Sequence, residues 1–243
     1  MIHHRSLACR LVASGLTLGG LVGAAGCGGP SHADVRRPDQ TAGNDESKRL
    51  APRDSFEAGK EVPISADTYY ASGQFLESQD RLDPAMDQYR KALKLDPKHR
   101  QTLYQVGIVL VKQRKLTEAI EAWNKYVTVT DGDATAYANL GFAYELAGRT
   151  TDAETAYGKG IRREPTNAVC RVNYGLMLAR KERFNEATMQ LQTVLSEADV
   201  NYNLASVYES LGRKEQAKIA YRKALKLAPN FADAQARLDA MGE

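Results

Sequence analysis

The feature that most constrains the fold of this chain is an internal repeat. The nine residues YRKALKLDP, Tyr89 to Pro97, return as YRKALKLAP, Tyr221 to Pro229, at an offset of 132 residues. Between these copies the same pattern of small and large residues recurs at intervals of 34, 34, 34 and 30 residues. A period of this size indicates supersecondary units that bury their apolar faces only by stacking on one another. The repeats begin near Ala66, Arg100, Ala134, Ala168 and Ala198.

Each repeat carries small and bulky residues at fixed positions, as two closely packed helices require. The eighth position is always small: Gly73, Gly107, Gly141, Gly175 and Ala205. The twentieth is always alanine: Ala85, Ala119, Ala153, Ala187 and Ala217. The twenty-fourth is always bulky: Tyr89, Trp123, Tyr157, Leu191 and Tyr221. Pro97, Pro165 and Pro229 close three of the repeats, since proline cannot continue a helix.

From about Ala66 to Gly242, these residues resemble the tetratricopeptide repeat (TPR) family. The resemblance implies an all-α fold, a right-handed α-solenoid of about five helix pairs whose core forms only between neighbours. The final stretch, FADAQARLDAMGE, places Ala234, Leu238 and Met241 on one face. We therefore predict that the solenoid occupies residues 66–243 and ends in a capping helix from about residue 231.

Three departures from the repeat predict local irregularities. Gly158 and Gly160 lie within a second helix, at about 1 kcal/mol each relative to alanine, so we expect softness over residues 158–164. Asp131 to Asp133, DGD, is expected to be a helix stop followed by a new N-cap, because the glycine and final glutamate of a calcium loop are missing. The fourth repeat is four residues short, which predicts a tighter bend over residues 196–199.

The N-terminal residues have the features of a targeting segment. Arg5 and Arg10 precede a mostly apolar stretch, residues 11–25, which is shorter than the roughly 20 residues that span a bilayer. Ala24 to Cys27, AAGC, resembles a bacterial lipobox with alanine where leucine is usual. We expect residues 1–26 to be a lipoprotein signal peptide and Cys27 to be lipidated, for instance with palmitate. Cleavage near Ala25 or Gly26 by the ordinary signal peptidase, without lipidation, is the alternative.

The residues after Cys27 predict a linker and a location. Residues 27–65 hold four prolines, mixed charges and almost no apolar periodicity, so they are expected to be a disordered linker. A lipidated protein of this kind belongs in the bacterial cell envelope. By analogy with the enterobacterial sorting rule, Gly28 after the cysteine favours the outer membrane, facing the periplasm, over the inner membrane.

The sequence holds little that supports catalysis. Beyond the signal segment only His32 and His99 remain, and Cys170 is the only cysteine besides Cys27. No metal-ligand spacing, phosphate-binding loop or nucleophile elbow is present, so we expect neither an enzyme nor a cofactor. The chain has 33 basic and 30 acidic residues, a balance that predicts no nucleic-acid binding.

The TPR resemblance implies that the first helix of each repeat lines a concave groove that binds a peptide. Four groove amides occupy the sixth position: Gln105, Asn139, Asn173 and Asn203. They would bond a peptide backbone; the alternative is that they bond locally. The aromatic candidates are Tyr70, Tyr104, Tyr202 and Phe142, some of which would instead be partly buried. The groove carboxylates are Glu77, Glu145 and Glu209. A clamp for C-terminal carboxylates is not expected, because its lysines are missing.

The second helix of the last repeat carries a basic face. Its members are Lys214, Lys218, Arg222, Lys223 and Lys226. This face would suit anionic lipid head groups or a polyanionic partner; the alternative is a solvated helix surface.

These features together predict a non-catalytic, membrane-anchored adaptor that binds a protein or peptide partner. Lipidated TPR proteins of this design resemble assembly factors for pili, secretion systems and outer-membrane proteins. The alternative is a structural component that associates with copies of itself, as a homo-oligomer without a separate client.

Overall fold

The computed structural model describes residues 63–242, which contain eleven α-helices and no strand. In chain order these are α2 (Ala66–Ser78), α3 (Leu82–Leu95), α4 (Arg100–Lys112), α5 (Leu116–Val129), α6 (Ala134–Leu146), α7 (Thr150–Arg163), α8 (Ala168–Arg180), α9 (Phe184–Gln192), α10 (Glu197–Ser210), α11 (Lys214–Leu227) and α12 (Ala232–Ala240). The predicted signal segment, Cys27 and nearly all of the predicted linker lie outside these residues.

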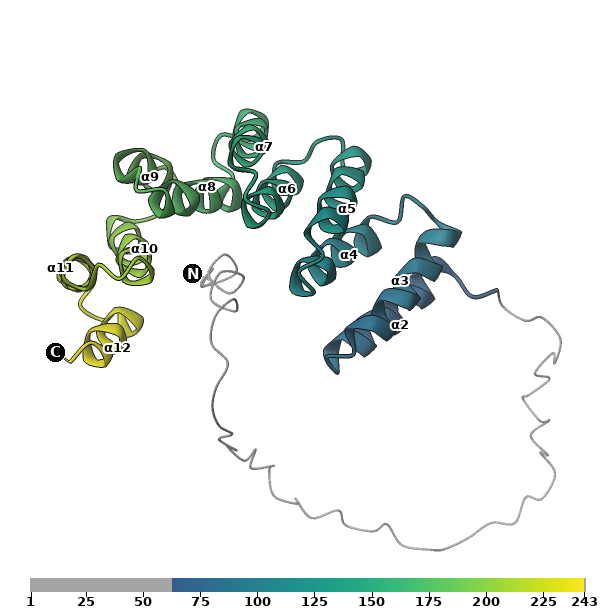
Figure 1. Ribbon diagram of the computed structural model, residues 1–243, viewed down its shortest axis with the longest axis horizontal. Coiled ribbons are helices and arrows are strands. Elements are labelled where there is room, and N and C mark those ends of the chain that lie inside the picture. The colour runs from purple at the N-terminus through teal and green to yellow at the C-terminus, as the bar shows by residue number, and fades with distance from the viewer. Residues whose placement is uncertain (1–62, 243) are drawn as a thin grey trace, which may run out of the picture. The chain divides into compact units, whose positions relative to one another are not determined.

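The helices pack as consecutive pairs along the chain (Figure 1). We call α2, α4, α6, α8 and α10 the first helices and α3, α5, α7, α9 and α11 the second helices. Each first helix packs against the second helix that follows it, and each later first helix also contacts the second helix before it. The helix α12 packs on α11 and buries Ala234 and Leu238. The prediction of an all-α solenoid of TPR-like helix pairs is confirmed.

The first helices all start at a side-chain N-cap. Side chains of the residues before them accept hydrogen bonds from backbone N–H groups of the first turn: Ser65, His99, Asp133, Asn167 and Ser196. These bonds satisfy amides that have no partner inside the helix. Asp133 is therefore the N-cap that the DGD sequence predicted, because its carboxylate accepts from the amides of Thr135 and Ala136.

The small residues at the eighth position allow the two helices of a pair to cross closely. A Cβ atom on Gly73 would lie 2.3 Å from the Tyr89 ring, and one on Gly107 would lie 2.4 Å from the Trp123 ring. Tyr89, Tyr157 and Tyr221 are completely buried as a result. The pairing of small and bulky positions read from the sequence is thus the contact that closes each pair.

The two glycines of α7 differ in their surroundings. A Cβ atom on Gly158 would meet only the flexible end of Arg162, at 3.5 Å. On Gly160 it would lie 2.3 Å from the Cys170 sulfur and 3.0 Å from the backbone oxygen of Ala134. Gly160 is therefore required by the approach of α8 to α7, whereas Gly158 weakens the helix without a packing reason.

The residues missing from the shortened fourth repeat are missing from its second helix, α9. The helix α9 has nine residues, whereas the other four second helices have 14. Ser196 then caps α10, and its side chain accepts from the amide of Asp199.

Candidate functional site

The surface formed by the first helices carries the residues predicted to line a groove. The three tyrosines predicted there are half-buried, because each ring packs on its neighbours. Tyr70 lies 5.6 Å from the His99 ring, and Tyr202 stacks on Phe231 at 4.8 Å. Phe142 is also half-buried. These rings therefore present part of their surface and use the rest for packing.

The three predicted groove carboxylates are bound within the protein. In alternate pairs the buried tyrosine of the second helix donates its hydroxyl to the glutamate of the first helix: Tyr89 to Glu77 at 3.0 Å, Tyr157 to Glu145 at 3.4 Å, and Tyr221 to Glu209 at 2.9 Å. A cation from the next first helix, or from α12, completes each group: Lys112 at 2.6 Å, Arg180 at 2.7 Å and Arg237 at 3.5 Å. We call these sets the Tyr–Glu–cation groups.

In the first Tyr–Glu–cation group, hydrogen bonds stabilise the charged form of the Glu77 carboxylate. Burial alone would raise the pKa of the Glu77 carboxyl, but hydrogen bonds from Lys112, Gln105 and Tyr89 outweigh it and hold that pKa below its ordinary value. Burial raises the pKa of the Tyr89 hydroxyl, which therefore stays protonated and donates. The three groups join the first, third and fifth pairs to the helix that follows each pair.

The four groove amides do not form one uniform row. Gln105 donates to Glu77 at 2.7 Å, and Asn203 donates to the backbone oxygen of Asp199 in its own helix at 2.8 Å. The Nδ2 atom of Asn139 is buried and has no hydrogen-bond partner among the described residues. Asn173 is half-buried. Binding of a peptide by these amides stays a prediction.

A depression of 410 Å³ opens between the first two pairs. Its lining comes from α2, α4 and α5, namely Tyr70, Arg100, Gln101, Tyr104 and Tyr126. We call it the aromatic depression. The rings of Tyr104 and Tyr126 lie 5.5 Å apart and both pack on Trp123, which is almost wholly buried. Arg100 and Gln101 are exposed at its edge. Aromatic faces beside a guanidinium and an amide are typical of protein-binding surfaces.

Sequence reasoning identified only part of this depression. It placed Tyr70 and Tyr104 on the groove surface. It did not connect Tyr126 or Arg100 with binding. The available signal was the bulky side chain of Tyr126, at a position where the TPR family usually has a small residue.

Comparisons with known proteins agree with this architecture. A model described as a tetratricopeptide repeat matches residues 198–231, and one described as the cilia and flagella-associated protein 70 middle TPR-like domain matches residues 61–164. The chain is a tetratricopeptide repeat protein.

Solved TPR structures resemble it in fold. YrrB, described as a TPR protein with an unusual peptide-binding site, is 23% identical with a TM-score of 0.51, over 74% of this chain and 94% of YrrB. A thermophilic TPR protein of Thermus thermophilus, TTC0263, is 24% identical with a TM-score of 0.53, over 72% of this chain and 98% of that protein. Pseudomonas aeruginosa pilF is 18% identical with a TM-score of 0.53, over 74% and 83%.

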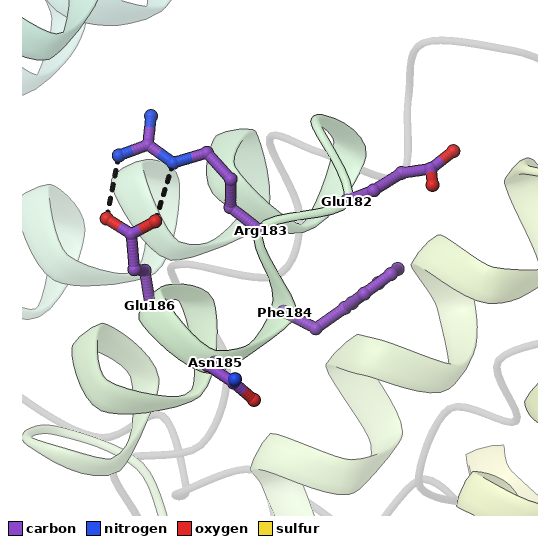
Figure 2. A pocket seen from close by; sticks show the side chains of 5 residues that line it. All are labelled: Glu182, Arg183, Phe184, Asn185 and Glu186. Carbon is purple, nitrogen blue, oxygen red and sulfur yellow. Dashed lines mark hydrogen bonds and ion pairs between the residues drawn. The ribbon is translucent and has the colours of Figure 1, made fainter.

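A second, smaller depression of 290 Å³ lies at the turn between the helices of the fourth TPR (Figure 2). Its lining is Glu182, Arg183, Phe184, Asn185 and Glu186. The guanidinium of Arg183 donates to both carboxylate oxygens of Glu186, each at 2.7 Å, and to Glu154 of α7 at 2.6 Å. Arg183 therefore joins the start of α9 to α7, and Glu182 at the same turn pairs with Arg213, which precedes α11. We assign this turn a structural role.

The basic face lies on α11 of the last TPR. Lys214, Arg222, Lys223 and Lys226 are exposed, and Lys218 is half-buried. Lys223 pairs with Glu197 of α10 at 3.1 Å. The same helix exposes Ile219 and Leu227, so the face is mixed rather than purely basic. Its binding to anionic head groups stays a prediction.

The nucleophilic and metal-binding side chains of the described TPR pairs are few. Burial raises the pKa of the Cys170 thiol to about 12, and its sulfur donates to the backbone oxygen of Ala134. His99 is buried between Asp67 and Thr102. Among residues 63–242 no cluster of three His, Cys, Asp or Glu side chains is placed to hold a metal, and no helix is both long and apolar enough to cross a bilayer.

Proposed function

We propose that this TPR protein is a non-catalytic adaptor that binds a protein or peptide partner on the surface of its first helices. The aromatic depression carries this proposal. It offers partly exposed tyrosine rings, whose apolar faces and hydroxyl groups suit an interface, next to the exposed Arg100 and Gln101. The fold also supports it, because YrrB of similar fold is described as having a peptide-binding site.

The chemistry of the depression defines the partner segment that fits it. Arg100 and the hydroxyl groups of Tyr70, Tyr104 and Tyr126 are hydrogen-bond donors, and the tyrosine rings form an apolar floor. A segment with an apolar or aromatic side chain beside an acceptor, such as a carboxylate or a backbone carbonyl, would satisfy both. The Tyr–Glu–cation groups lie on the same helices but have their hydrogen bonds filled, so we assign them to the scaffold.

We further propose that the adaptor is anchored in the bacterial envelope through lipidated Cys27 and acts in the assembly of a pilus, a secretion system or outer-membrane proteins. The AAGC sequence and the linker composition support the anchor. The resemblance to envelope assembly factors of lipidated TPR design supports the role. A self-associating structural component without a separate client is the second candidate.

Quantitative affinity capture from detergent-solubilised envelopes tests the adaptor role. The bait is the full chain, compared with its Arg100→Glu and Gln101→Glu variants. The matched control is Lys181→Glu, which reverses a charge at an exposed turn away from the depression. We expect one or a few proteins to be lost at least fivefold with Arg100→Glu and retained with the control. Equal capture by all baits would reject the depression as the binding surface.

The predicted amides are tested in the same format. Asn139, Asn173 and Asn203 changed together to alanine would lower capture if they bond a peptide backbone. If the triple variant captures the same proteins as wild type while Arg100→Glu does not, recognition lies in the aromatic depression alone.

A further inference from the structure

The tenth residue of each repeat lies in the first helix and, in the four later repeats, is buried between neighbouring pairs. Its side chain belongs to the same buried clusters as the preceding second helix: Val109 with Met86 and Tyr89 of α3, for example, and Met177 with Ala153 and Tyr157 of α7. In the four later repeats this residue is buried, with exposed fractions of 0, 0, 0 and 4% for Val109, Ala143, Met177 and Val207. The tenth position of a repeat is therefore normally buried by the preceding helix pair.

The first repeat departs from this rule. Phe75 occupies the tenth position of α2 and is 64% exposed. The residues around it on the helix are also exposed and uncharged: Thr68, Ala71, Ser72 and Gln79. Ile64, just before the start of the same helix, is 55% exposed. We call these six residues the α2 face.

The two ends of the described solenoid are finished differently. At the C-terminal end α12 covers α11, and its outer residues are mostly charged or small. Solenoids need such a polar cap, because the last unit otherwise leaves apolar surface in water. Among residues 63–242 no element covers the α2 face in this way. A large exposed phenylalanine at a position that is buried elsewhere indicates that something packs there.

Charge and shape favour a second copy of this chain as the occupant. The α2 face contains no charged residue, so two copies meet without like-charge repulsion. Its centre consists of small residues, which allow two helices to approach closely, and its large apolar residues lie at opposite ends. In an antiparallel pair the start of one helix lies beside the end of the other, so a large residue of each copy meets one of its partner. Such self-complementarity is what an isologous two-fold interface requires.

We propose that the α2 face is a self-association surface, on which the α2 helices of two copies pack antiparallel with Phe75 of each against Ile64 of the other. One helix of 13 residues is about 20 Å long. Two such faces bury an area at the low end for specific interfaces, which gives a reversible dimer rather than a permanent one. The first-helix surface with the aromatic depression stays available for another partner.

Cross-linking of the full chain in bacterial cells tests this proposal. Ala71 lies near the middle of α2, so Ala71→Cys places two thiols close to the two-fold axis, within reach of a short bis-maleimide. Thr151→Cys, on an exposed position of α7, is the matched control, and the parent chain with its own cysteines sets the background. We expect a dimer band at least tenfold above background for Ala71→Cys and none above background for Thr151→Cys. Equal bands from both variants would overturn the proposal. No band from Ala71→Cys would also overturn it, because a face that is free or covered by another protein gives no dimer.

A charge exchange tests the partner and the register together. Phe75→Asp and Ile64→Lys, each combined with Ala71→Cys, should reduce the dimer band to background, whereas the two together should restore at least half of it. Met189→Asp is the control, because Met189 is equally exposed, at 68%, but lies on α9. Phe75 makes little contact within its own chain, so the variants should fold, which their circular dichroism checks. A band that survives Phe75→Asp, or is not restored in the double variant, would contradict the antiparallel pairing.

Discussion

The sulfur of Cys170 and the α-carbon of Gly160 approach so closely that no side chain fits between them. A Cβ atom at Gly160 would lie 2.3 Å from the sulfur, which itself donates a hydrogen bond to the backbone oxygen of Ala134 at 3.1 Å. This contact joins three consecutive helices, α6, α7 and α8. Two glycines that are alike in the sequence, Gly158 and Gly160, thus have opposite roles.

The first prediction follows from that difference. Gly160→Ala should lower the free energy of unfolding by about 1–3 kcal/mol, the usual cost of forcing extra volume into a packed core. Gly158→Ala should raise it by about 1 kcal/mol, because it only improves helix propensity in open space. Urea unfolding followed by circular dichroism measures both. If both substitutions changed the free energy of unfolding in the same direction, the close packing of Gly160 against Cys170 would be contradicted.

A second prediction concerns the turn inside each pair. Gly148 has a φ of +72°, and nothing lies within 4 Å of a Cβ atom built on it. Gly148→Ala should therefore destabilise by about 1–2 kcal/mol through backbone conformation alone. Gly148→Asn should cost less, since asparagine tolerates this region. Thermal unfolding compares the two variants, and equal stability of alanine and glycine here would contradict the turn geometry.

The third prediction is the acid sensitivity that Glu77 confers. Its pKa is lowered in the folded state, so its stabilising contribution is fully present above the ordinary glutamate pKa and is lost as the pH falls through the folded value. Glu77→Gln should lower the free energy of unfolding at pH 7 by about 1.5–3 kcal/mol, the range for hydrogen bonds to a charged group. The variant should also lose less stability than wild type between pH 5 and pH 3, a window set by the roughly 4.3 pKa of a free glutamate.

Glu118→Gln provides the control for that measurement. Glu118 lies in the first turn of α5 and is exposed. Thermal unfolding of wild type and both variants over the same pH series should separate Glu77→Gln from the other two. If the stability of all three proteins changed in parallel with pH, Glu77 would not be responsible for the acid sensitivity.

A fourth prediction addresses the anchor. Cells expressing the chain and supplied with a labelled fatty acid should incorporate the label into wild type and not into Cys27→Ala. The variant should also leave the membrane fraction, because the proposed anchor depends on this single residue. Label that persists without Cys27 would disprove lipidation at this site.

The sequence allowed the helix pairs to be predicted, because their chemistry repeats. The small eighth and bulky twenty-fourth positions touch each other within one pair, so Gly73 and Tyr89 could be matched from spacing alone. The N-cap role of Asp133 was likewise local, since the residues that it bonds follow it directly.

Contacts between pairs could not be predicted in the same way. Glu77 looked like a groove carboxylate until the structure brought Lys112 and Gln105 of the next repeat to it. The difference between Gly158 and Gly160 depends on Cys170, which belongs to the following helix. A single sequence shows which residue stands at each position but not which residue of the neighbouring unit approaches it. The aromatic depression is built from such approaches.

Photo-cross-linking in cells is the measurement that tests the adaptor role most directly. A benzophenone amino acid replaces Gln101 at the edge of the aromatic depression in the full chain, and Thr151 on α7 in the control. After irradiation we expect a discrete adduct with another protein from position 101, absent from position 151 and lost when Arg100→Glu is added. No adduct from position 101, or the same adducts from both positions, would contradict the adaptor role.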